Sequence, residues 1–294
     1  MKVTCRLVGG IGNQLFIYAA ARRLAISNHA DLCVDFASGF ERDSTYKRSC
    51  QLNHFLIPDN IQFKNFDISF YKRVRRYLNR KINKFLPFKY RTHICQTGDD
   101  YDSRLLELRF KKNIFLEGYW QSERYFKDIE KILRTDLKFM PPVDFANCEM
   151  KQQIDKCVSV AVHVRFFDRP DESAGSNVAS DYYDRAIAYI DAMEPQAHYF
   201  VFSDQPSAAL SRLAFPRGRV TVVSHNQGDE NAYADLWLMS LCQHFIIANS
   251  TFSWWGAWLS ERQGKIVIAP KVRINHGKMA WGFEGLLPDE WIQL

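Results

Sequence analysis

The sequence predicts an α/β protein built on parallel β-sheets. Near the N-terminus, residues 3–8 form an apolar strand pattern, and a glycine-rich turn leads from it into a helix pattern over residues 13–26. A second strand pattern follows at residues 31–36, which gives the β–loop–α–β order of a parallel sheet. The C-terminal half of the chain repeats the alternation of strands and helices.

The strands predicted in the C-terminal half are apolar along their whole length. Such strands are typical of a parallel sheet that helices cover on both faces. The predicted strands are residues 158–164, 198–203, 220–224, 244–249 and, as the last of them, 265–270. The predicted helices lie near residues 181–193, 230–242 and 253–262.

The size and composition of the chain allow two folded domains. It has 294 residues, of which 47% are hydrophobic, so it can bury a substantial core. The best boundary is the Met140-Pro141-Pro142 stretch, which predicts domains at residues 1–142 and 143–294. The net charge of +6 suits an anionic ligand such as a nucleotide, or an anionic surface.

The N-terminus lacks the shape of a signal peptide, and no apolar stretch approaches the ~20 residues of a membrane span. We therefore expect the chain to stay in the cytosol. Its 7 cysteines are odd in number and include no C-x-x-C pair, which indicates neither a disulfide framework nor a zinc site.

Residues 70–91 form a strongly basic segment. Nine Lys or Arg residues and no acidic residue lie from Lys72 to Arg91. Three interpretations are open: a solvated basic helix packed on the first domain, a patch resting on anionic lipid, or a nucleic-acid contact. No stacking or groove-reading motif accompanies the charge, so we expect no nucleic-acid partner. Its apolar side chains share one helical face: Phe70, Val74, Tyr77, Leu78, Ile82 and Phe85.

The first motif with chemical potential is GGIGNQLF, residues 9–16. Its glycines permit a tight turn, and the helix that follows directs its N-terminal amides at the same point, which favours a phosphate or a sugar oxygen. The dinucleotide fingerprint is only partly met, because Leu15 stands in place of the third glycine. An ordinary tight turn is the alternative. The candidate donor-binding residues are Gly10, Gly12, Asn13 and Gln14.

The second motif is HVRFFD, residues 163–168, at the C-terminal end of a buried strand. Ligands of open α/β sheets bind beyond such ends. His163 and Arg165 have the same strand parity, and the forked donors of an arginine suit a diphosphate. Asp168 is a candidate base, or it holds the arginine or a backbone amide. The alternative for the motif is a surface ion pair.

The third motif is FSDQ, residues 202–205, at the end of another strand. Ser203 and Asp204 are able to hydrogen-bond a base or a ribose, and a carboxylate pairs well with the N–H edge of guanine. An Asp that caps a helix is an equally physical interpretation.

The fourth motif, NSTFSWWGAWL at residues 249–259, is the most specific. A strand delivers its polar residues to the ligand edge of the sheet, and Ser253 is a candidate cap for a helix whose amides face the phosphates. The three tryptophans of the motif favour packing over sugar binding. The candidate donor-binding residues are Asn249, Ser250, Thr251 and Ser253.

One further pattern, Asp100-Tyr101-Asp102, has the D-x-D form of metal-dependent transferases. No clear strand precedes it, so we expect it to lie in a loop.

Taken together, the motifs resemble the α-1,2-fucosyltransferases of glycosyltransferase family eleven. The resemblance runs from about residue 5 to the closing DEWIQL, and includes GYWQSERYF at residues 118–126 and DLWLMSLCQHFIIANSTFSWWGAWL at residues 235–259. It implies a GT-B-like fold of two Rossmann-like domains whose parallel sheets face a central cleft. It also implies GDP-fucose as the donor, no metal, and inversion of a β-linked donor to an α-linked product.

The resemblance also implies roles for individual residues. Arg165 would bind the β-phosphate of the donor, and His163 and Asp204 would line the guanosine site. Asn13 would lie near the phosphate and the fucose. The residues that would act in catalysis are Arg165, Asp168 and His163, and those that would hold phosphate oxygens are Ser250 and Thr251.

The sequence departs from the family at one motif. The family pattern is H-x-R-R-G-D-Y, whereas Phe166 and Phe167 replace the second Arg and the Gly here, and Arg169 replaces the Tyr. One positive charge is therefore absent from the loop, which bears on donor affinity and on which sugar the donor carries.

Two other classes of protein compete with the transferase. An oxidoreductase would need the third glycine and a catalytic Tyr-x-x-x-Lys pair, and a sugar-binding protein would not need an Arg beside a phosphate-facing helix. The acceptor is expected to be a galactoside, free or carried on a lipid at the inner membrane face. A related GDP-deoxysugar such as GDP-colitose is an open alternative for the donor.

Overall fold

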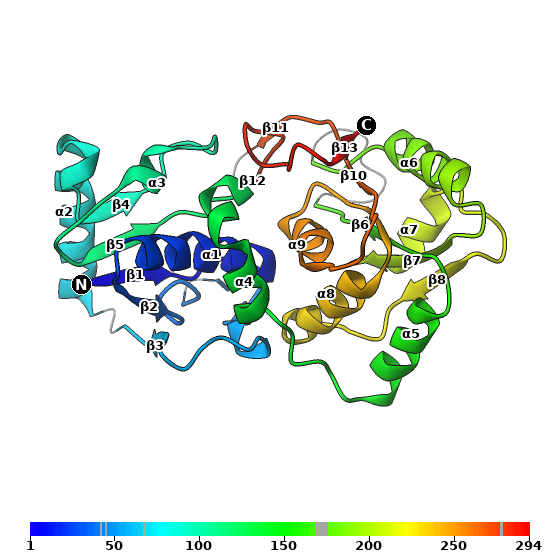
Figure 1. Ribbon diagram of the computed structural model, residues 1–294, viewed down its shortest axis with the longest axis horizontal. Coiled ribbons are helices and arrows are strands. Elements are labelled where there is room, and N and C mark those ends of the chain that lie inside the picture. Colours follow the sequence, from blue (N-terminus) through cyan, green and yellow to red (C-terminus); the bar gives the residue numbers. More distant parts are fainter. Residues whose placement is uncertain (42, 45, 67–68, 168–175, 277–278) are drawn as a thin grey trace. The chain divides into compact units, whose positions relative to one another are not determined.

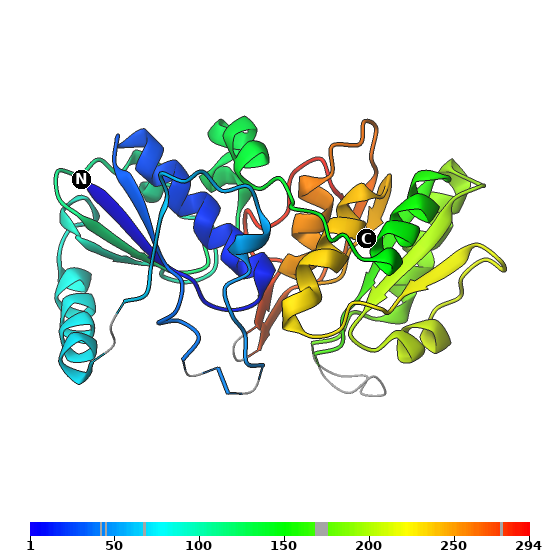
Figure 2. The same ribbon diagram turned by 90° about the horizontal axis from the view of Figure 1, so that it is seen from below.

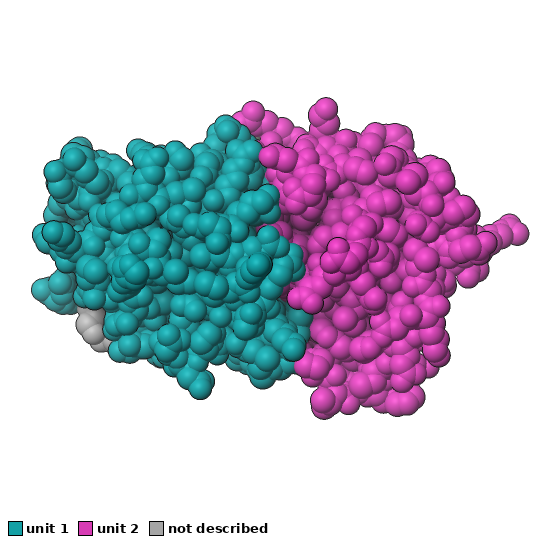
Figure 3. Space-filling model, viewed as in Figure 1, with its two compact units in different colours: residues 1–140, 284–286 teal, residues 141–283, 287–294 magenta. Residues whose placement is uncertain are grey.

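The computed structural model describes residues 1–41, 43–44, 46–66, 69–167, 176–276 and 279–294. The chain forms two compact units, coloured separately in Figure 3: Met1–Met140 with Glu284–Leu286, and Pro141–Phe283 with Leu287–Leu294. The sequence carries no signal for the return of residues 284–286 to the first unit. There the amide of Glu284 donates to Asp100 Oδ1 at 3.0 Å, and its carbonyl accepts from the amide of Tyr101 at 3.1 Å.

The first unit contains a five-stranded parallel sheet in the order β3-β2-β1-β5-β4. The strands predicted at residues 3–8 and 31–36 are present as β1 and β2, paired in parallel. The other three strands are only three or four residues long and have no clear sequence pattern. The bounds are β1 Lys2–Arg6, β2 Asp31–Asp35, β3 Gln62–Lys64, β4 His93–Cys95 and β5 Ile114–Glu117.

Two long helices lie on opposite faces of this sheet, as Figure 2 shows. Helix α1 (Ile11–Ser27) is buried over most of its length and packs on β1 and β2. Helix α2 (Phe70–Phe85) packs beside β4. The shorter helices of the unit are η1 Leu52–His54, η2 Phe88–Tyr90, α3 Arg104–Glu107, η3 Glu123–Tyr125, η4 Lys127–Ile129 and α4 Glu130–Asp136.

The second unit contains a six-stranded parallel sheet in the order β13-β10-β9-β6-β7-β8. All five strands predicted in this half are present within a few residues of their expected bounds. The prediction that residues 265–270 form the last strand is wrong, however. The end of the chain forms one more strand, β13, which pairs with β10. The bounds are β6 Ser159–Val164, β7 His198–Ser203, β8 Val220–Val223, β9 His244–Ile246, β10 Val267–Ala269 and β13 Ile292–Gln293. A small antiparallel pair adds β11 Ile274–His276 and β12 Met279–Trp281.

Helices cover both faces of the second sheet (Figure 1). Helices α6 and α7 pack with alternate residues of β6 and β7 into one apolar core, and α8 and α9 pack against each other. This packing is close at Gly256, where a Cβ atom would lie 2.4 Å from Met239 Sδ. The bounds are α5 Phe145–Asp155, α6 Ser180–Met193, α7 Pro206–Arg212, η5 Asp229–Asn231, α8 Ala232–Leu241 and α9 Thr251–Leu259.

Candidate active site

Three neighbouring strands of the second sheet bring the predicted residues to one edge. Strand β6 lies between β7 and β9, and in a parallel sheet all three end on the same side. Arg165 follows β6, Asp204 follows β7, and residues 249–251 follow β9 and begin α9. The sheet topology therefore gathers the HVRFFD, FSDQ and NSTFSWW motifs at one place.

Arg165 and Asp204 form the central contact of this edge. Arg165 Nη1 lies 3.2 Å from Asp204 Oδ2, and both side chains are partly exposed. The other carboxylate oxygen of Asp204 accepts a hydrogen bond from the amide of Phe166 at 3.1 Å. Asp204 thus fixes both the guanidinium and the loop that carries it, so within this unit it acts as a positioning residue.

His163 lies beneath this edge and is buried. Its Nδ1 is 2.8 Å from Ser253 Oγ, and its ring packs near Phe252. Burial, and then the charge of Arg165, lower the pKa of His163 to about 3. A buried imidazole with so low a pKa is a poor general base at neutral pH. The catalytic role predicted for His163 stays a prediction.

The N-terminus of α9 is capped by Ser250, whose Oγ accepts from the amide of Phe252 at 3.3 Å. The prediction that Ser253 caps this helix is wrong, because Ser253 lies inside the helix and is fully buried against His163. Thr251 is the first residue of α9. Helix N-terminal amides bind anions readily, so this end supplies donors next to Arg165.

Three further candidates occupy supporting or undescribed positions. Asn249 is buried, and its Nδ2 donates to the carbonyl of Ser176 at 2.7 Å. Ser203 Oγ accepts from the amide of Gln205 at 3.0 Å, which shapes the turn after β7. Asp168, the candidate base, lies outside the described residues.

The two phenylalanines that replace Arg and Gly have distinct environments. Phe166 is buried in the apolar core between the sheet and helices α6 and α7. Phe167 is half-exposed, and the guanidinium carbon of Arg165 lies 5.4 Å from its ring centroid. An aromatic face at this distance attracts a cation, so Phe167 adds a second contact that orients Arg165.

The glycine motif of the first unit forms a turn at the end of β1. Gly9 has φ +79°, and a Cβ there would lie 2.6 Å from Asn13 Nδ2. A side chain at this position would be strained and would crowd Asn13, so glycine is strongly favoured there. Gly10 caps α1, and Gly12 lies within its first turn rather than in the loop. Asn13 is partly exposed, and its Oδ1 accepts from Gln121 Nε2 at 2.8 Å.

Gln14 has a structural role instead of the expected ligand contact. Its side chain is fully buried, and its Nε2 donates to the carbonyls of Gly9 and Ser49 at 3.0 and 2.9 Å. Its Oε1 accepts from the amide of Gln51 at 2.8 Å. Gln14 therefore ties the glycine turn to the segment around residue 50.

Sequence reasoning missed one titratable group at the second sheet. Asp235, in the first turn of α8, accepts a hydrogen bond from Asn226 Nδ2 at 2.9 Å. Burial raises the pKa of Asp235 to about 7 despite that hydrogen bond. A perturbed carboxyl near the ends of the strands is a typical feature of functional sites. The only local signal is an acidic residue in an otherwise apolar helix.

One group of described residues has donor atoms spaced for a metal ion: His93, Cys95 and Glu117, within 4.8 Å of one another. The carboxylate of Glu117 already accepts from His93 Nε2 at 3.0 Å, and it pairs with Arg6 at 3.4 Å and Arg80 at 3.2 Å. Two guanidinium groups this close repel a divalent cation, so we assign no metal to these residues.

The D-x-D pattern lies in a loop, as predicted, although β4 does precede it. Asp102 is engaged by Arg104 Nη2 at 2.6 Å, and Asp100 accepts from the amide of Glu284. Both carboxylates therefore have structural partners.

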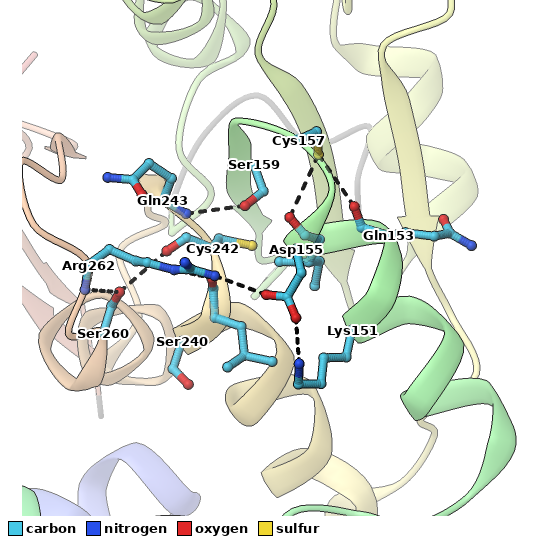
Figure 4. Close-up of polar contacts among 12 residues, drawn as sticks. Lys151, Gln153, Asp155, Cys157, Ser159, Ser240, Cys242, Gln243, Ser260 and Arg262 are labelled. Carbon is cyan, nitrogen blue, oxygen red and sulfur yellow. Dashed lines mark hydrogen bonds and ion pairs between the residues drawn. The ribbon is translucent and has the colours of Figure 1, made fainter.

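A hollow of about 580 Å³ opens at the opposite edge of the second sheet, where the strands begin. Figure 4 shows two ion pairs at this edge: Arg262 pairs with Asp155 at 3.0 Å, and Asp155 also pairs with Lys151. Ligands of parallel sheets bind at the other edge, so the hollow is distinct from the candidate active site.

Comparisons with known proteins identify the family of the chain and relatives with the same fold. The sequence model of the family "Glycosyl transferase family 11" matches residues 36–294. The chain is 27% identical to the Escherichia coli "Alpha-1,2-colitosyltransferase" over 301 residues, which cover 99% of this chain and 98% of the relative. It is 28% identical to the Escherichia coli "O-antigen biosynthesis glycosyltransferase WbnK" over 310 residues, which cover 98% and 99% of the two chains.

Solved structures give the same fold at lower identity. A variant of Arabidopsis thaliana FUT1 in complex with GDP matches with a TM-score of 0.53 and 12% identity, over 94% of this chain and 71% of that one. The NodZ alpha-1,6-fucosyltransferase co-crystallized with GDP matches with a TM-score of 0.50 and 17% identity, over 87% and 91% of the chains.

The fold and the sequence matches define a glycosyltransferase that uses a nucleotide sugar. The chain belongs to glycosyl transferase family 11. The predicted α/β fold of the GT-B type, with two parallel sheets, is confirmed, as is the resemblance to this family.

Proposed function

We propose that the protein transfers L-fucose from GDP-β-L-fucose to the 2-hydroxyl of a galactoside, with inversion to an α-1,2 linkage and without a metal ion. Membership of family 11 and the two Escherichia coli relatives support sugar transfer. The two solved structures named above were determined with GDP, which supports a guanosine diphosphate donor.

The observation that carries the proposal is the position of Arg165. Asp204 and Phe167 hold its guanidinium at the end of β6. Strand β9, which lies beside β6 in the sheet, leads into the N-terminus of α9. A fixed guanidinium beside the N-terminus of a helix is suited to a diphosphate, because both supply hydrogen bonds and positive potential.

The proposed reaction is a single displacement. The acceptor hydroxyl oxygen bonds to C1 of the sugar while the bond from C1 to the β-phosphate oxygen breaks, and GDP leaves with the electron pair. Arg165 and the α9 amides stabilise the charge that grows on the departing diphosphate. The hydroxyl proton passes to a base, for which Asp168 is the candidate.

A second donor has its own support. The Escherichia coli relative with 27% identity over nearly the whole of both chains is an alpha-1,2-colitosyltransferase. Colitose, like fucose, is a deoxysugar, and the same diphosphate site would serve a GDP-colitose donor.

The acceptor is proposed to be a galactoside such as lactose, N-acetyllactosamine or galactosyl-N-acetylgalactosamine, free or carried on a lipid at the cytosolic membrane face. The O-antigen role of the second Escherichia coli relative supports a glycan acceptor.

The proposal is tested by incubating the purified protein with GDP-fucose or GDP-colitose and a panel of galactosides, and determining the product linkage by NMR. An α-1,2-linked product that forms equally with EDTA supports the proposal. Dependence on Mn²⁺ would remove the metal-free mechanism, and tight GDP binding without any product would indicate a non-catalytic binding protein.

A further inference from the structure

Helix α2 packs on its sheet through charge rather than through apolar side chains. Arg76 Nη2 lies 3.5 Å from Asp35 Oδ2, and Arg80 Nε lies 3.2 Å from Glu117 Oε2. Asn83 Oδ1 accepts from the amides of Thr92 and His93, at 2.7 and 3.0 Å, where β4 begins. The polar side of the helix therefore faces the unit.

The register of the strands explains this orientation. Arg6 is paired with Asp35 across β1 and β2, and Cys95 with Glu117 across β4 and β5, so these four side chains share one face of the sheet. Glu117 is buried there with a pKa of about 2: burial alone would raise it, but the hydrogen bond with His93 and the charges of Arg6 and Arg80 lower it. A charged sheet face attracts the cationic side of α2.

The apolar side of α2 consequently points away from the sheet. The large side chains of this face, defined here as the α2 apolar face, are exposed: Tyr71 by 74%, Tyr77 by 58%, Leu78 by 51%, Ile82 by 59% and Phe85 by 89%. Leu86 and Tyr90, just beyond the helix, are exposed as well. A contiguous group of exposed large apolar side chains marks an interaction surface.

Charge decides which partner fits the α2 apolar face. Exposed cations border it, among them Arg75, Lys81, Lys84 and Lys89, and the sequence has no acidic residue from Ser69 to Gly98. A second copy of the chain would bring two such cationic faces together, which like-charge repulsion opposes. An anionic bilayer satisfies both requirements, because its acyl region accepts apolar side chains and its headgroups attract the cations.

We propose that α2 docks the protein on an anionic phospholipid bilayer, with the α2 apolar face inserted among the headgroups. Among the described residues, no helix has the length and apolar character needed to cross a bilayer. Docking through α2 is thus peripheral. Arg76, Arg80 and Asn83 connect the docked helix to the sheet of the first unit.

The test is co-sedimentation of the full chain with phosphatidylcholine vesicles prepared with and without phosphatidylglycerol. Binding to the anionic vesicles alone, weakened as salt rises to about 0.5 M, is expected. A triple variant of the face, Leu78→Ser, Ile82→Ser and Phe85→Ser, should lower binding at least about 10-fold. Replacing Lys81 and Lys84 by Gln should lower it by about 5-fold per lysine.

Matched controls come from exposed residues elsewhere. The variant Val143→Ser, Phe145→Ser and Leu210→Ser removes comparably exposed apolar side chains from the second unit and should bind as the parent does. Melting temperatures of all variants, compared with the parent, show that each folds.

Three results would overturn the proposal. The first is the absence of binding to anionic vesicles at low salt, and the second is undiminished binding of the folded α2 variants. The third is a dimer in light scattering that the α2 variants dissociate, which would identify a second copy as the partner.

Discussion

Arg165 Nη1 and Asp204 Oδ2 lie 3.2 Å apart, and they join the ends of two adjacent parallel strands. The same carboxylate accepts a hydrogen bond from the amide of Phe166. The side chain of Asp204 therefore holds both the guanidinium of Arg165 and the loop that follows it. Because the ion pair is partly exposed, it stabilises the fold by only about 0–1 kcal/mol. Its consequence is orientation, because the guanidinium is held in place at the strand ends before any ligand binds.

Replacing Arg165 by Ala should leave the fold intact and lower turnover at least about 100-fold. Loss of one preorganised contact to developing charge typically costs ~3 kcal/mol. The measurement is steady-state transfer with GDP-fucose at saturating acceptor. The control is Arg219→Ala, because Arg219 pairs with Asp191 at 3.0 Å with similar exposure but before β8, at the other edge of the sheet. Equal activity of the two variants would contradict the assignment.

Replacing Asp204 by Asn should lower kcat/KM for the donor about 10-fold. The side chain still accepts from the amide of Phe166, but the ion pair that orients Arg165 is lost. A misplaced catalytic group typically costs up to about 100-fold in rate. Removing a negative charge also favours binding of the diphosphate, but at a partly exposed site by no more than about 1 kcal/mol. The loss of orientation of Arg165 therefore has the larger effect on kcat/KM. Asp191→Asn is the matched control. An unchanged or higher kcat/KM would show that orientation is unimportant.

The low pKa of His163 predicts acid lability of the second unit. Its ordinary pKa of 6.5 falls to about 3 in the fold, so below pH 6.5 the unfolded chain binds a proton that the folded chain does not. His163 therefore makes the free energy of unfolding fall as pH drops from 6.5 toward 3, by up to about 1.4 kcal/mol per pH unit. Urea unfolding of parent and His163→Asn over this range measures the difference.

The exposed His29 provides the control for this experiment. His29 has φ 49°, a conformation that Asn tolerates well, so His29→Asn should retain the parent's pH dependence. His163→Asn should flatten it. Identical slopes for parent and His163→Asn would contradict the buried, neutral imidazole.

Asp235 should have the opposite effect on stability. Its pKa rises from 3.8 to about 7 in the fold, so the folded chain holds the extra proton between these values. Because of Asp235, the free energy of unfolding is highest below pH 3.8 and falls as pH rises toward and through 7. Asp235→Asn should raise the melting temperature above neutral pH, whereas Asp184→Asn, at an exposed position of α6, should not. A lower melting temperature for Asp235→Asn at that pH would refute the prediction.

The strands of the second unit could be predicted because they are continuously apolar, and the positions of Arg165 and Asp204 followed from the ends of those strands. In the first unit, β4 was missed because His93 and Cys95 face a charged partner, Glu117, instead of an apolar core. The sequence pattern of a short segment does not show which residues, more than twenty positions away, will contact it in the fold.

The same limit applies to side-chain roles. The amide of Gln14 looked like a ligand contact, but its three partners come from residues 9, 49 and 51. The helix over residues 70–85 and its apolar face were predictable from periodicity. Its orientation was not, because it depends on Asp35 and Glu117 in distant strands.

The most direct test of the account is titration calorimetry of the folded protein with GDP, accompanied by thermal melting. Measurable heat and a higher melting temperature are expected with GDP, and little of either with NAD. Arg165→Ala should show a large loss of GDP affinity. Neither heat nor a thermal shift with GDP at about millimolar concentration, where even weak binding of about 4 kcal/mol is detectable, would contradict the proposed diphosphate site.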